Sequence, residues 1–409
     1  MPRPDIPRRA AEFFAGMGLV RAALESPGPG AGFRVAYAND FDAGKRRVYR
    51  ALFPEGVAHL DGRPIADIAA ADVPPCIIWT ASFPCTDLSL AGGRGGIHAG
   101  QSGAVWELLR LLNETEPSRQ PRWVLFENVP GLLSSHGGAD FRSLVAALNR
   151  AGYGVDVMRV SAVHFTPQSR ARVFVIATAL DDPEAPRRAD PAQIPVSEAR
   201  PALVIDAMRC APEAVWHARD LPPLPTRESA LSSIVERVPD DSPRWWSGPR
   251  VEYFLAQVHP NHKPALERAR CAAALAHLPA FRRVRAIDGV KRSVAELRFD
   301  GVAGCLRTPK GGSAKQILVE AGHGRVRVRH FTGRECLRLQ GVDIDPPEGI
   351  TERDLLYALG DAVCVPAVRW VLDRLESRPA QAGAPATMAS DADAPIRSAP
   401  ASSMATAVR

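Results

Sequence analysis

The stretch Phe13-Phe-Ala-Gly-Met-Gly18 decides how this chain is expected to fold. It stands where a first strand, Ala11 to Phe14, would turn into a first helix, Leu19 to Glu25. Glycines at such a turn let the backbone approach a ligand closely, and a helix N-terminus favours a carboxylate or phosphate. Alone the pattern is weak, because glycines at a strand-to-helix turn often serve only to make the turn.

Outward from this turn, strand-like and helix-like segments alternate through the first 180 residues. This alternation is typical of a doubly wound α/β sheet. We predict further strands at Arg34 to Ala38, Cys76 to Ala81, Trp123 to Phe126, Val155 to Val160 and Arg172 to Ala177. We predict further helices at Ala43 to Leu52, Ala104 to Glu114 and Asp140 to Ala151.

The alternation breaks at the Pro-rich stretch from Asp181 to Pro225, and the chain onward to Arg329 shows only short, irregular elements. Regular structure resumes at Thr332-Gly-Arg-Glu335, whose capping-box spacing predicts a helix through Leu339. We predict a first domain of residues 1–180, an inserted domain of residues 181–329, a C-terminal segment of residues 330–377 that returns to the first domain, and a disordered tail of residues 378–409.

Composition and charge narrow the class of protein. With 409 residues and 46% apolar content the chain can bury a large core. The net charge is only +6, but residues 263–329 carry 15 Lys and Arg against 5 Asp and Glu. A local positive field suits a phosphate backbone, although a solvated basic face without a partner is equally consistent with this count alone.

Cysteine usage favours a reducing compartment. The seven cysteines form no CxxC pair, which argues against a disulfide framework and a structural zinc site. No apolar run approaches the ~18 residues needed to span a bilayer, and no signal peptide is recognisable. We expect a cytoplasmic protein that binds neither metal nor membrane.

The segment after the second strand points to a nucleoside cofactor. In Tyr37-Ala-Asn-Asp-Phe-Asp42 an acidic residue stands where such folds accept hydrogen bonds from ribose hydroxyls. Arg21 occupies the third glycine position of GxGxxG, which argues against a dinucleotide. A mononucleoside such as S-adenosylmethionine fits better.

A cysteine and a carboxylate follow two of the predicted strands. Cys85 follows Pro84 in polar surroundings and precedes the glycine-rich loop Gly92-Gly-Arg-Gly-Gly96, although most lone cysteines are merely buried small hydrophobes. Glu127 ends another strand, with an ion-paired carboxylate as the alternative reading. Ligands of open α/β sheets bind at these strand ends, where a thiolate and a carboxyl are the groups needed to attack and protonate a heteroaromatic base.

Taken together, these residues make the chain resemble the bacterial restriction-modification type of DNA (cytosine-5)-methyltransferase. The resemblance implies a Rossmann-like, S-adenosylmethionine-dependent methyltransferase sheet and a smaller target-recognition domain. It covers about Ala11 to Val371 in the family's order. The matching blocks are Phe14-Ala-Gly-Met-Gly18, Asn39-Asp-Phe-Asp42, Phe83-Pro-Cys85 with Ser89, Glu127-Asn-Val129, Gln168-Ser-Arg-Ala-Arg172, Arg334-Glu-Cys-Leu-Arg-Leu-Gln-Gly341 and Gly360-Asp-Ala-Val363.

The resemblance also implies a mechanism. Cys85 would attack C6 of a flipped cytosine while Glu127 holds or protonates N3, so that C5 accepts the methyl group. Arg170 and Arg172 would help to lower the pKa of the thiol, and Arg172 would contact the base. The loop from Ser89 to Gly103 would close over the pocket.

The implied cofactor is S-adenosylmethionine, without a metal. For Asp67 a loop-capping role is an equal alternative. The implied contacts are Phe14, Gly16 and Gly18 along the methionine moiety, Asp40 on the ribose hydroxyls, Phe41 on the adenine face, Asp67 near the adenine amino group, and Val363 completing the pocket.

Three positions depart from the family pattern. Leu19 replaces a frequent glycine, Thr86 a usual glutamine, and Asp361 a common asparagine. None removes a reacting atom. Asp361 would weaken cofactor binding if its charge faced the methionine carboxylate.

Residues 181–329 correspond in position to the family's target-recognition domain, which predicts double-stranded DNA as the partner. Trp245-Trp246 is expected in the core rather than stacked on bases. We expect a nucleoid-associated monomer, with a separately acting restriction endonuclease as a candidate companion. The predicted DNA contacts are Arg282, Arg283, Arg285, Lys291, Arg292, Arg307 and Lys310.

Two alternatives stay open on sequence grounds. The same chemistry serves transfer RNA in a eukaryotic branch of the superfamily, but that branch has a shorter recognition region. A catalytically silent DNA-binding protein could retain the scaffold, but the intact Cys85, Glu127, Arg170 and Arg172 speak against it.

Overall fold

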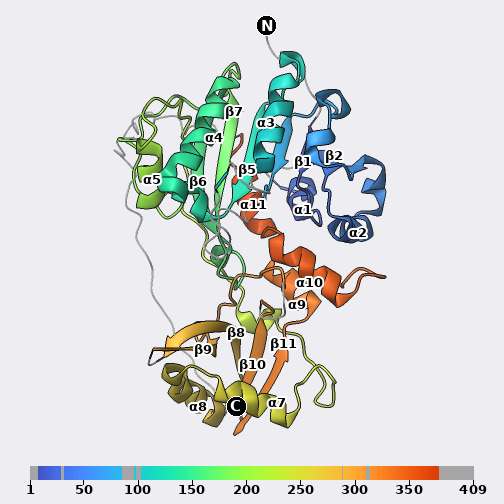
Figure 1. Cartoon of the computed structure of the whole chain (residues 1–409), viewed down its shortest axis with the longest axis vertical. Coiled ribbons are helices and arrows are strands. Elements are labelled where there is room, and N and C mark those ends of the chain that lie inside the picture. Colours follow the sequence, from blue (N-terminus) through green and yellow to red (C-terminus); the bar gives the residue numbers. More distant parts are fainter. Residues whose placement is uncertain are drawn as a thin grey trace, which may run out of the picture.

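The computed structural model describes residues 8–28, 32–84, 96–97, 103–287, 289–309 and 314–376. Figure 1 shows a larger body built around one sheet, a smaller body built around a second sheet, and helices α9 (Gly333–Leu339) and α10 (Glu352–Asp361) between them. The predicted tail, residues 378–409, lies outside the described residues.

The larger body contains a seven-stranded sheet in the order β3-β2-β1-β4-β5-β7-β6. Strand β7 is antiparallel to both of its neighbours, and the other neighbouring pairs are parallel. This confirms the predicted doubly wound sheet. Its strands are β1 (Arg9–Phe13), β2 (Arg34–Asn39), β3 (Leu60–Asp61), β4 (Ile78–Ala81), β5 (Trp123–Asn128), β6 (Tyr153–Ser161) and β7 (Ala171–Ala179).

Helices cover both faces of this sheet. One core cluster holds residues of α1, α2, α9, α10 and α11, and a second holds residues of α3, α4 and α5. Helices α1, α2 and α3 have the predicted bounds, and α4 begins and ends one residue earlier than predicted. The helices not yet given bounds are α1 (Leu19–Glu25), α2 (Ala43–Leu52), α3 (Ala104–Glu114), α4 (Ala139–Arg150), α5 (Ala202–Arg209) and α11 (Val365–Leu372).

Local chemistry explains where two of these helices begin. At α2, the Asp42 side chain accepts a hydrogen bond from the Lys45 backbone N–H at 2.9 Å. At α9, Thr332 and Glu335 form the reciprocal capping box that the sequence predicts. Gly18, before α1, has φ 87°, and a Cβ there would lie 2.6 Å from the Phe53 ring. No larger residue fits that turn.

The smaller body is an antiparallel sheet in the order β11-β10-β8-β9. Trp246, Phe254, Leu266 and the inward side chains of the strands form its core, so the expectation of a core position is confirmed for Trp246. It is wrong for Trp245, which is half-buried outside this core with the Arg327 guanidinium 4.1 Å from its ring centroid. The elements are β8 (Ala276–Ile287), β9 (Val290–Leu297), β10 (Ile317–Gly322), β11 (Arg325–His330), α7 (Gly248–Ala256) and α8 (Lys263–Cys271).

The expectation of only short, irregular elements before Arg329 is therefore wrong, since β8 has 12 residues. Arg282 interrupts the alternation of apolar and polar residues along β8. Its guanidinium lies 5.7 Å from the Trp246 ring centroid and 5.9 Å from that of Phe254, and its Nε donates to Gln257 at 2.9 Å. An arginine thus occupies a strand position where an apolar residue would mark the inward face.

The chain after β7 still packs on the larger body. Trp216 and the inner face of α5 lie in the same core cluster as β6. Buried Asp156 of β6 pairs with Arg200 at 2.7 Å and accepts the Arg219 backbone N–H at 2.9 Å. A recognition domain beginning at residue 181 stays a proposal, and this packing favours a later start. The short helix α6 (Leu231–Ile234) follows.

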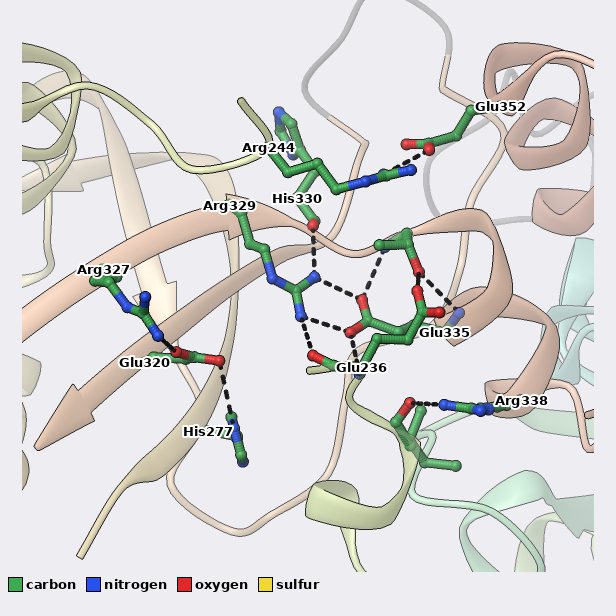
Figure 2. Close-up of polar contacts among 12 residues, drawn as sticks. Glu236, Arg244, His277, Glu320, Arg327, Arg329, His330, Glu335, Arg338 and Glu352 are labelled. Carbon is green, nitrogen blue, oxygen red and sulfur yellow. Dashed lines mark hydrogen bonds and ion pairs between the residues drawn. The ribbon is translucent and has the colours of Figure 1, made fainter. Parts of the chain in front are cut away.

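A buried ion pair joins the smaller body to the C-terminal segment (Figure 2). The Arg329 guanidinium of β11 points at the Glu335 carboxylate of α9 (Figure 2). The two hydrogen bonds between them are 2.6 and 2.8 Å long. Both side chains are fully buried. Glu335 also accepts the backbone N–H groups of Thr332 and Glu236, each at 2.8 Å. All four hydrogen bonds compensate the burial of its charge.

The expectation that no apolar run approaches the length of a membrane span is wrong for Glu352–Leu372, which is apolar and long enough by length and composition. It comprises α10 and α11, separated by residues 362–364, and most of it is buried inside the protein. Both helices contribute to the core cluster on one face of the large sheet. This is the pattern of core helices.

Candidate active site

The candidate site lies at the carboxyl ends of β4 and β5. These two strands are parallel neighbours, so both end at the same edge of the sheet. After β4 the chain passes through buried Phe83 to Pro84, the last described residue of this segment. Cys85 lies outside the described residues, so its role as nucleophile stays a prediction.

Asn128 fixes the chain that leads to Cys85. Its Nδ2 donates to the Phe83 carbonyl at 3.0 Å, and its side chain oxygen accepts the Val129 N–H at 2.8 Å. Phe83 packs edge-on against Phe126, with ring centroids 6.3 Å apart. The sequence pattern includes Asn128 in a matching block but gives no reason to single it out, because its partner is a distant backbone carbonyl.

Glu127 and Arg172 meet at this edge. Because β7 runs antiparallel to β5, its first residues lie beside the last residues of β5, with Glu127 opposite Phe174. Arg172 Nε lies 2.8 Å from Glu127 Oε1, and the two side chains are 15% and 10% exposed. The structure thus brings these two predicted site residues together as an ion pair that is nearly buried but still reachable.

Arg170 occupies a different position. It is buried, and its guanidinium donates to the carbonyls of Leu306 at 3.0 Å, Gly360 at 3.5 Å and Ala362. These carbonyls belong to two separate segments, which Arg170 ties to the large sheet. The contacts favour a positioning role, and direct participation in catalysis stays a prediction.

Gln168 is a second positioning residue that the sequence pattern did not single out. It is fully buried, and its Nε2 donates to the Leu339 carbonyl at 2.7 Å. Its Oε1 accepts the Leu306 N–H at 3.2 Å. Gln168 and Arg170 therefore both bind the Leu306 backbone, Gln168 at its N–H and Arg170 at its carbonyl. Both also bind carbonyls of the C-terminal segment.

Cys305 brings a thiol to this group. Its Sγ lies 3.2 Å from Arg170 Nη1. Burial disfavours the thiolate, but the guanidinium groups of Arg170, Arg172 and Arg307 outweigh it and lower the pKa of Cys305 below its ordinary value. Within the described ranges, no three His, Cys, Asp or Glu residues are grouped so as to hold a metal ion.

The predicted cofactor turn has an unusual backbone. Phe14 has φ 56° and Gly16 φ 59°, and positive φ at a non-glycine residue stores strain that often marks a functional site. Nothing lies within 4 Å of the place where a Gly16 Cβ would stand. Asp40 accepts the N–H groups of Gly16 and Asp42, both at 2.8 Å, and so joins the ends of β1 and β2.

Two further predicted cofactor residues border this turn. Burial raises the pKa of the Asp40 carboxyl, although Lys45 and the two backbone N–H groups partly offset the effect. Phe41 beside it is 56% exposed, an uncommon state for a large apolar ring.

The remaining two lie on separate segments. Asp67 is exposed at the end of a short 3₁₀ turn, Ile65–Asp67, and the cap of the next turn comes from Asp72. Val363 is buried between α10 and α11.

The predicted DNA-contacting residues fall into three groups. Arg282 faces the core, as described above. Arg283 and Arg285 share Glu296, at 3.4 and 2.6 Å. The others are exposed or lie outside the described residues: Lys291, Arg292 and Arg307 are exposed, and Lys310 is not described.

Three of these cations, Arg283, Arg285 and Arg292, lie on one face of β8 and β9. The strand register places Arg285 opposite Arg292 and Phe281 opposite Glu296, on the face away from the core residues Ala280 and Ala295. A Cβ on Gly304 would lie 3.3 Å from the Phe281 ring. The basic face therefore turns towards the segment that carries Cys305.

The chain is similar to known methyltransferases over nearly its whole length. Residues 9–377 match the family model of the C-5 cytosine-specific DNA methylases. The Type II methyltransferase M.NgoBI of Neisseria gonorrhoeae is 24% identical over 366 residues, which is 88% of this chain and 90% of that protein.

Two further relatives align over shorter stretches. Type II methyltransferase M2.BsuMI of Bacillus subtilis is 39% identical over 28% of this chain, and M.Bsp6I of Bacillus sp. is 30% identical over 41%. These alignments span 29% and 50% of those two relatives, less than two thirds of either.

Solved structures show the same fold at low sequence identity. The Dnmt2 methyltransferase of S. pombe superposes with TM-score 0.57 at 17% identity, over 89% of this chain and 96% of that one. The Entamoeba histolytica methyltransferase EhMeth superposes with TM-score 0.56 at 15% identity, over 90% and 97%.

Proposed function

The chain belongs to the C-5 cytosine-specific DNA methylase family, and on that premise we propose that it methylates C5 of cytosine in a short sequence of double-stranded DNA. The methyl donor is S-adenosylmethionine. The observation that carries the proposal is the Glu127–Arg172 ion pair, 2.8 Å long, beside the Phe83-Pro84 turn that leads into Cys85. The Type II relatives support a role in restriction-modification in the bacterial cytoplasm, with a separate endonuclease as companion.

The residues at the ends of β1 and β2 fit the proposed cofactor. The exposed Phe41 ring offers a face for adenine, and Asp40 supplies a carboxylate for ribose hydroxyls. The open space above Gly16 leaves room for the methionine part. When bound, S-adenosylmethionine supplies an electrophilic methyl group on a sulfonium.

The target cytosine must leave the base stack before the strand ends can reach it, because C6 is inaccessible in a duplex. The Cys85 thiolate then adds to C6, and a bond forms between sulfur and carbon. Glu127 protonates N3 as this happens, so the electron pair of the C5–C6 bond becomes available at C5. In this account Arg172 orients the Glu127 carboxyl through its 2.8 Å contact.

The cycle closes by elimination. After C5 has taken the methyl group, a base removes the C5 proton, the bond between Cys85 and C6 breaks, and the N3 proton returns to Glu127. The thiolate and the aromatic ring are restored. Asn128 holds Phe83 in place during this cycle, which keeps Cys85 within reach of the base.

Trapping tests the proposal directly. Duplex DNA with 5-fluorocytosine at the target should form an SDS-stable complex with the protein and S-adenosylmethionine, because fluorine cannot leave as the C5 proton does. Cys85→Ser should form none. Labelled methyl transfer to DNA without a trapped adduct would contradict the addition-elimination route. Methyl transfer to RNA and not to DNA would show that the substrate is RNA.

A further inference from the structure

An ion pair joins α2 to the end of α10 close to the proposed cofactor residues. Lys45 Nζ lies 2.8 Å from Asp361 Oδ2, and Thr308 Oγ1 donates to Asp361 Oδ1 at 2.8 Å. A Cβ on Gly360 would lie 2.0 Å from the Thr308 nitrogen. Only glycine therefore lets the two segments approach closely enough for this contact.

The Lys45 ammonium stands among several carboxylates. Burial disfavours its charge, but Asp361, Asp40 and Asp42 outweigh this and raise the pKa of Lys45. Lys45 and Thr308 in turn lower the pKa of Asp361, against the effect of burial. Both groups are charged at neutral pH, and Lys45 is the cation shared by three acidic residues.

Asp361 places a negative charge at the end of α10, close to the proposed cofactor residue Asp40 through their shared neighbour Lys45. Without Lys45, which contacts it at 2.8 Å, that charge would more strongly repel the carboxylate of an amino acid bound nearby and would more strongly attract a sulfonium. Lys45 restores the balance at this position. The pair thus has an electrostatic role beyond joining two helices.

We propose that Lys45 is a positioning and specificity-determining residue of the cofactor site, because it neutralises Asp361 and so sets the preference between a sulfonium ligand and its uncharged thioether product. This proposal rests on the proposed function. S-adenosylmethionine and S-adenosylhomocysteine are suitable probes, since both carry the amino-acid carboxylate and only the first carries the sulfonium charge.

The test is a set of calorimetric titrations of the full chain with each probe. Lys45→Gln should weaken S-adenosylhomocysteine binding by about fivefold and S-adenosylmethionine binding less, because the additional negative charge attracts the sulfonium. Adding Asp361→Asn to this variant should restore both affinities and their ratio. Asp361→Asn alone should reduce the preference for S-adenosylmethionine.

Arg47→Gln is the matched control. Arg47 joins the same two helices through Asp354 at 2.7 Å. Its replacement weakens the attachment of one helix to the other without changing the charge beside Asp361, and it should leave the ratio of the two affinities unchanged.

The failures of the two proposals are distinguishable. A wild-type ratio in Lys45→Gln, or no reversal by Asp361→Asn, overturns the role of Lys45 while cofactor binding stands. Wild-type protein that binds neither probe overturns the proposed function and this role together. Thermal unfolding of each variant without ligand shows whether a reduced affinity merely reflects a failure to fold.

Discussion

At the scale of single residues, the candidate site depends on groups that only the fold brings together. Glu127 and Arg172 are 45 positions apart in the chain, and they meet because β7 returns antiparallel beside β5. The ion pair fixes one Glu127 oxygen and leaves the carboxyl reachable. The orientation of this carboxyl is what the proposed proton transfer requires.

Glu127→Gln tests that requirement. The amide keeps the shape of the side chain but cannot give a proton to N3, so the rate of methyl transfer should fall by about 10²- to 10⁴-fold. Single-turnover transfer of labelled methyl groups to DNA measures it. Arg172→Met should give a smaller loss of rate, because the carboxyl is present but no longer oriented. Equal rates for wild type and Glu127→Gln would remove Glu127 from the mechanism.

Glu12 offers a test of buried charge in the larger body. It accepts the Arg21 backbone N–H at 3.3 Å, and burial raises the pKa of its carboxyl from 4.5 to about 8. Between these values the folded state binds one proton more than the unfolded state. The stabilisation from the protonated Glu12 carboxyl is therefore fully present below pH 4.5. It is lost as the pH rises through about 8.

Urea unfolding at several pH values from 5 to 8 measures this effect. The wild-type free energy of unfolding should fall by up to about 1.4 kcal/mol per pH unit from this group alone. Glu12→Gln, which cannot ionise, should show a flatter profile. The same slope in both proteins would mean that Glu12 is ionised throughout.

The sequence predicts part of the site and not the rest, for a physical reason. Residues whose own chemistry stands out at a strand end, such as Glu127 and Asp40, can be proposed from a local pattern. Asn128 and Gln168 act on carbonyls of distant segments, and no local pattern reveals such partners. The matching block predicts a catalytic role for Arg170 but does not reveal that its guanidinium contacts the backbone of the C-terminal segment.

At the scale of elements, the sequence predicts the start of helix α9 from its cap but does not predict the small antiparallel sheet. The Thr332 and Glu335 capping box is local, and it specified α9 correctly. In β8 the alternation of apolar and polar residues is obscured, because Arg282 faces aromatic rings of the core. The junction in Figure 2 then depends on the register that places Arg329 at the end of β11.

Glu335→Gln tests this junction. It leaves a fully buried Arg329 guanidinium without its counter-ion, which should cost about 3–5 kcal/mol in the free energy of unfolding. Urea denaturation measures the loss. The paired change Arg329→Met with Glu335→Leu should cost clearly less, because no charge is left buried. A loss below about 1 kcal/mol for Glu335→Gln would contradict a compensated buried pair.

At the scale of the whole molecule, the face of β8 and β9 that carries Arg283, Arg285 and Arg292 turns towards the segment around Cys305. Cys305 in turn contacts Arg170 of the larger body. Arg283 and Arg285 share the Glu296 carboxylate, whereas Lys291 and Arg292 are exposed at the start of β9. Phosphate contacts are expected first from the exposed pair, since the shared pair already has an anionic partner.

Salt dependence of DNA binding separates these groups. The double change Lys291→Gln with Arg292→Gln should reduce the slope of log affinity against log salt by about 0.9 for each phosphate that the protein no longer neutralises. Glu296→Gln should instead strengthen binding, because it releases two arginines. Lys263→Gln with Arg268→Gln, on exposed positions of α8, is the control. If the double change at Lys291 and Arg292 left the salt slope of DNA binding unchanged, these two residues would not contact phosphates and would simply face solvent.

The central claim is that this chain methylates cytosine at C5 through Cys85, and one measurement tests it most directly. A plasmid recovered from a methylation-deficient bacterial host that expresses the chain is mapped for 5-methylcytosine at base resolution, beside a Cys85→Ala control. The account predicts methylation at one short motif, absent with the control. Unmodified DNA from soluble, cofactor-binding wild-type protein, or equal methylation with Cys85→Ala, would contradict it.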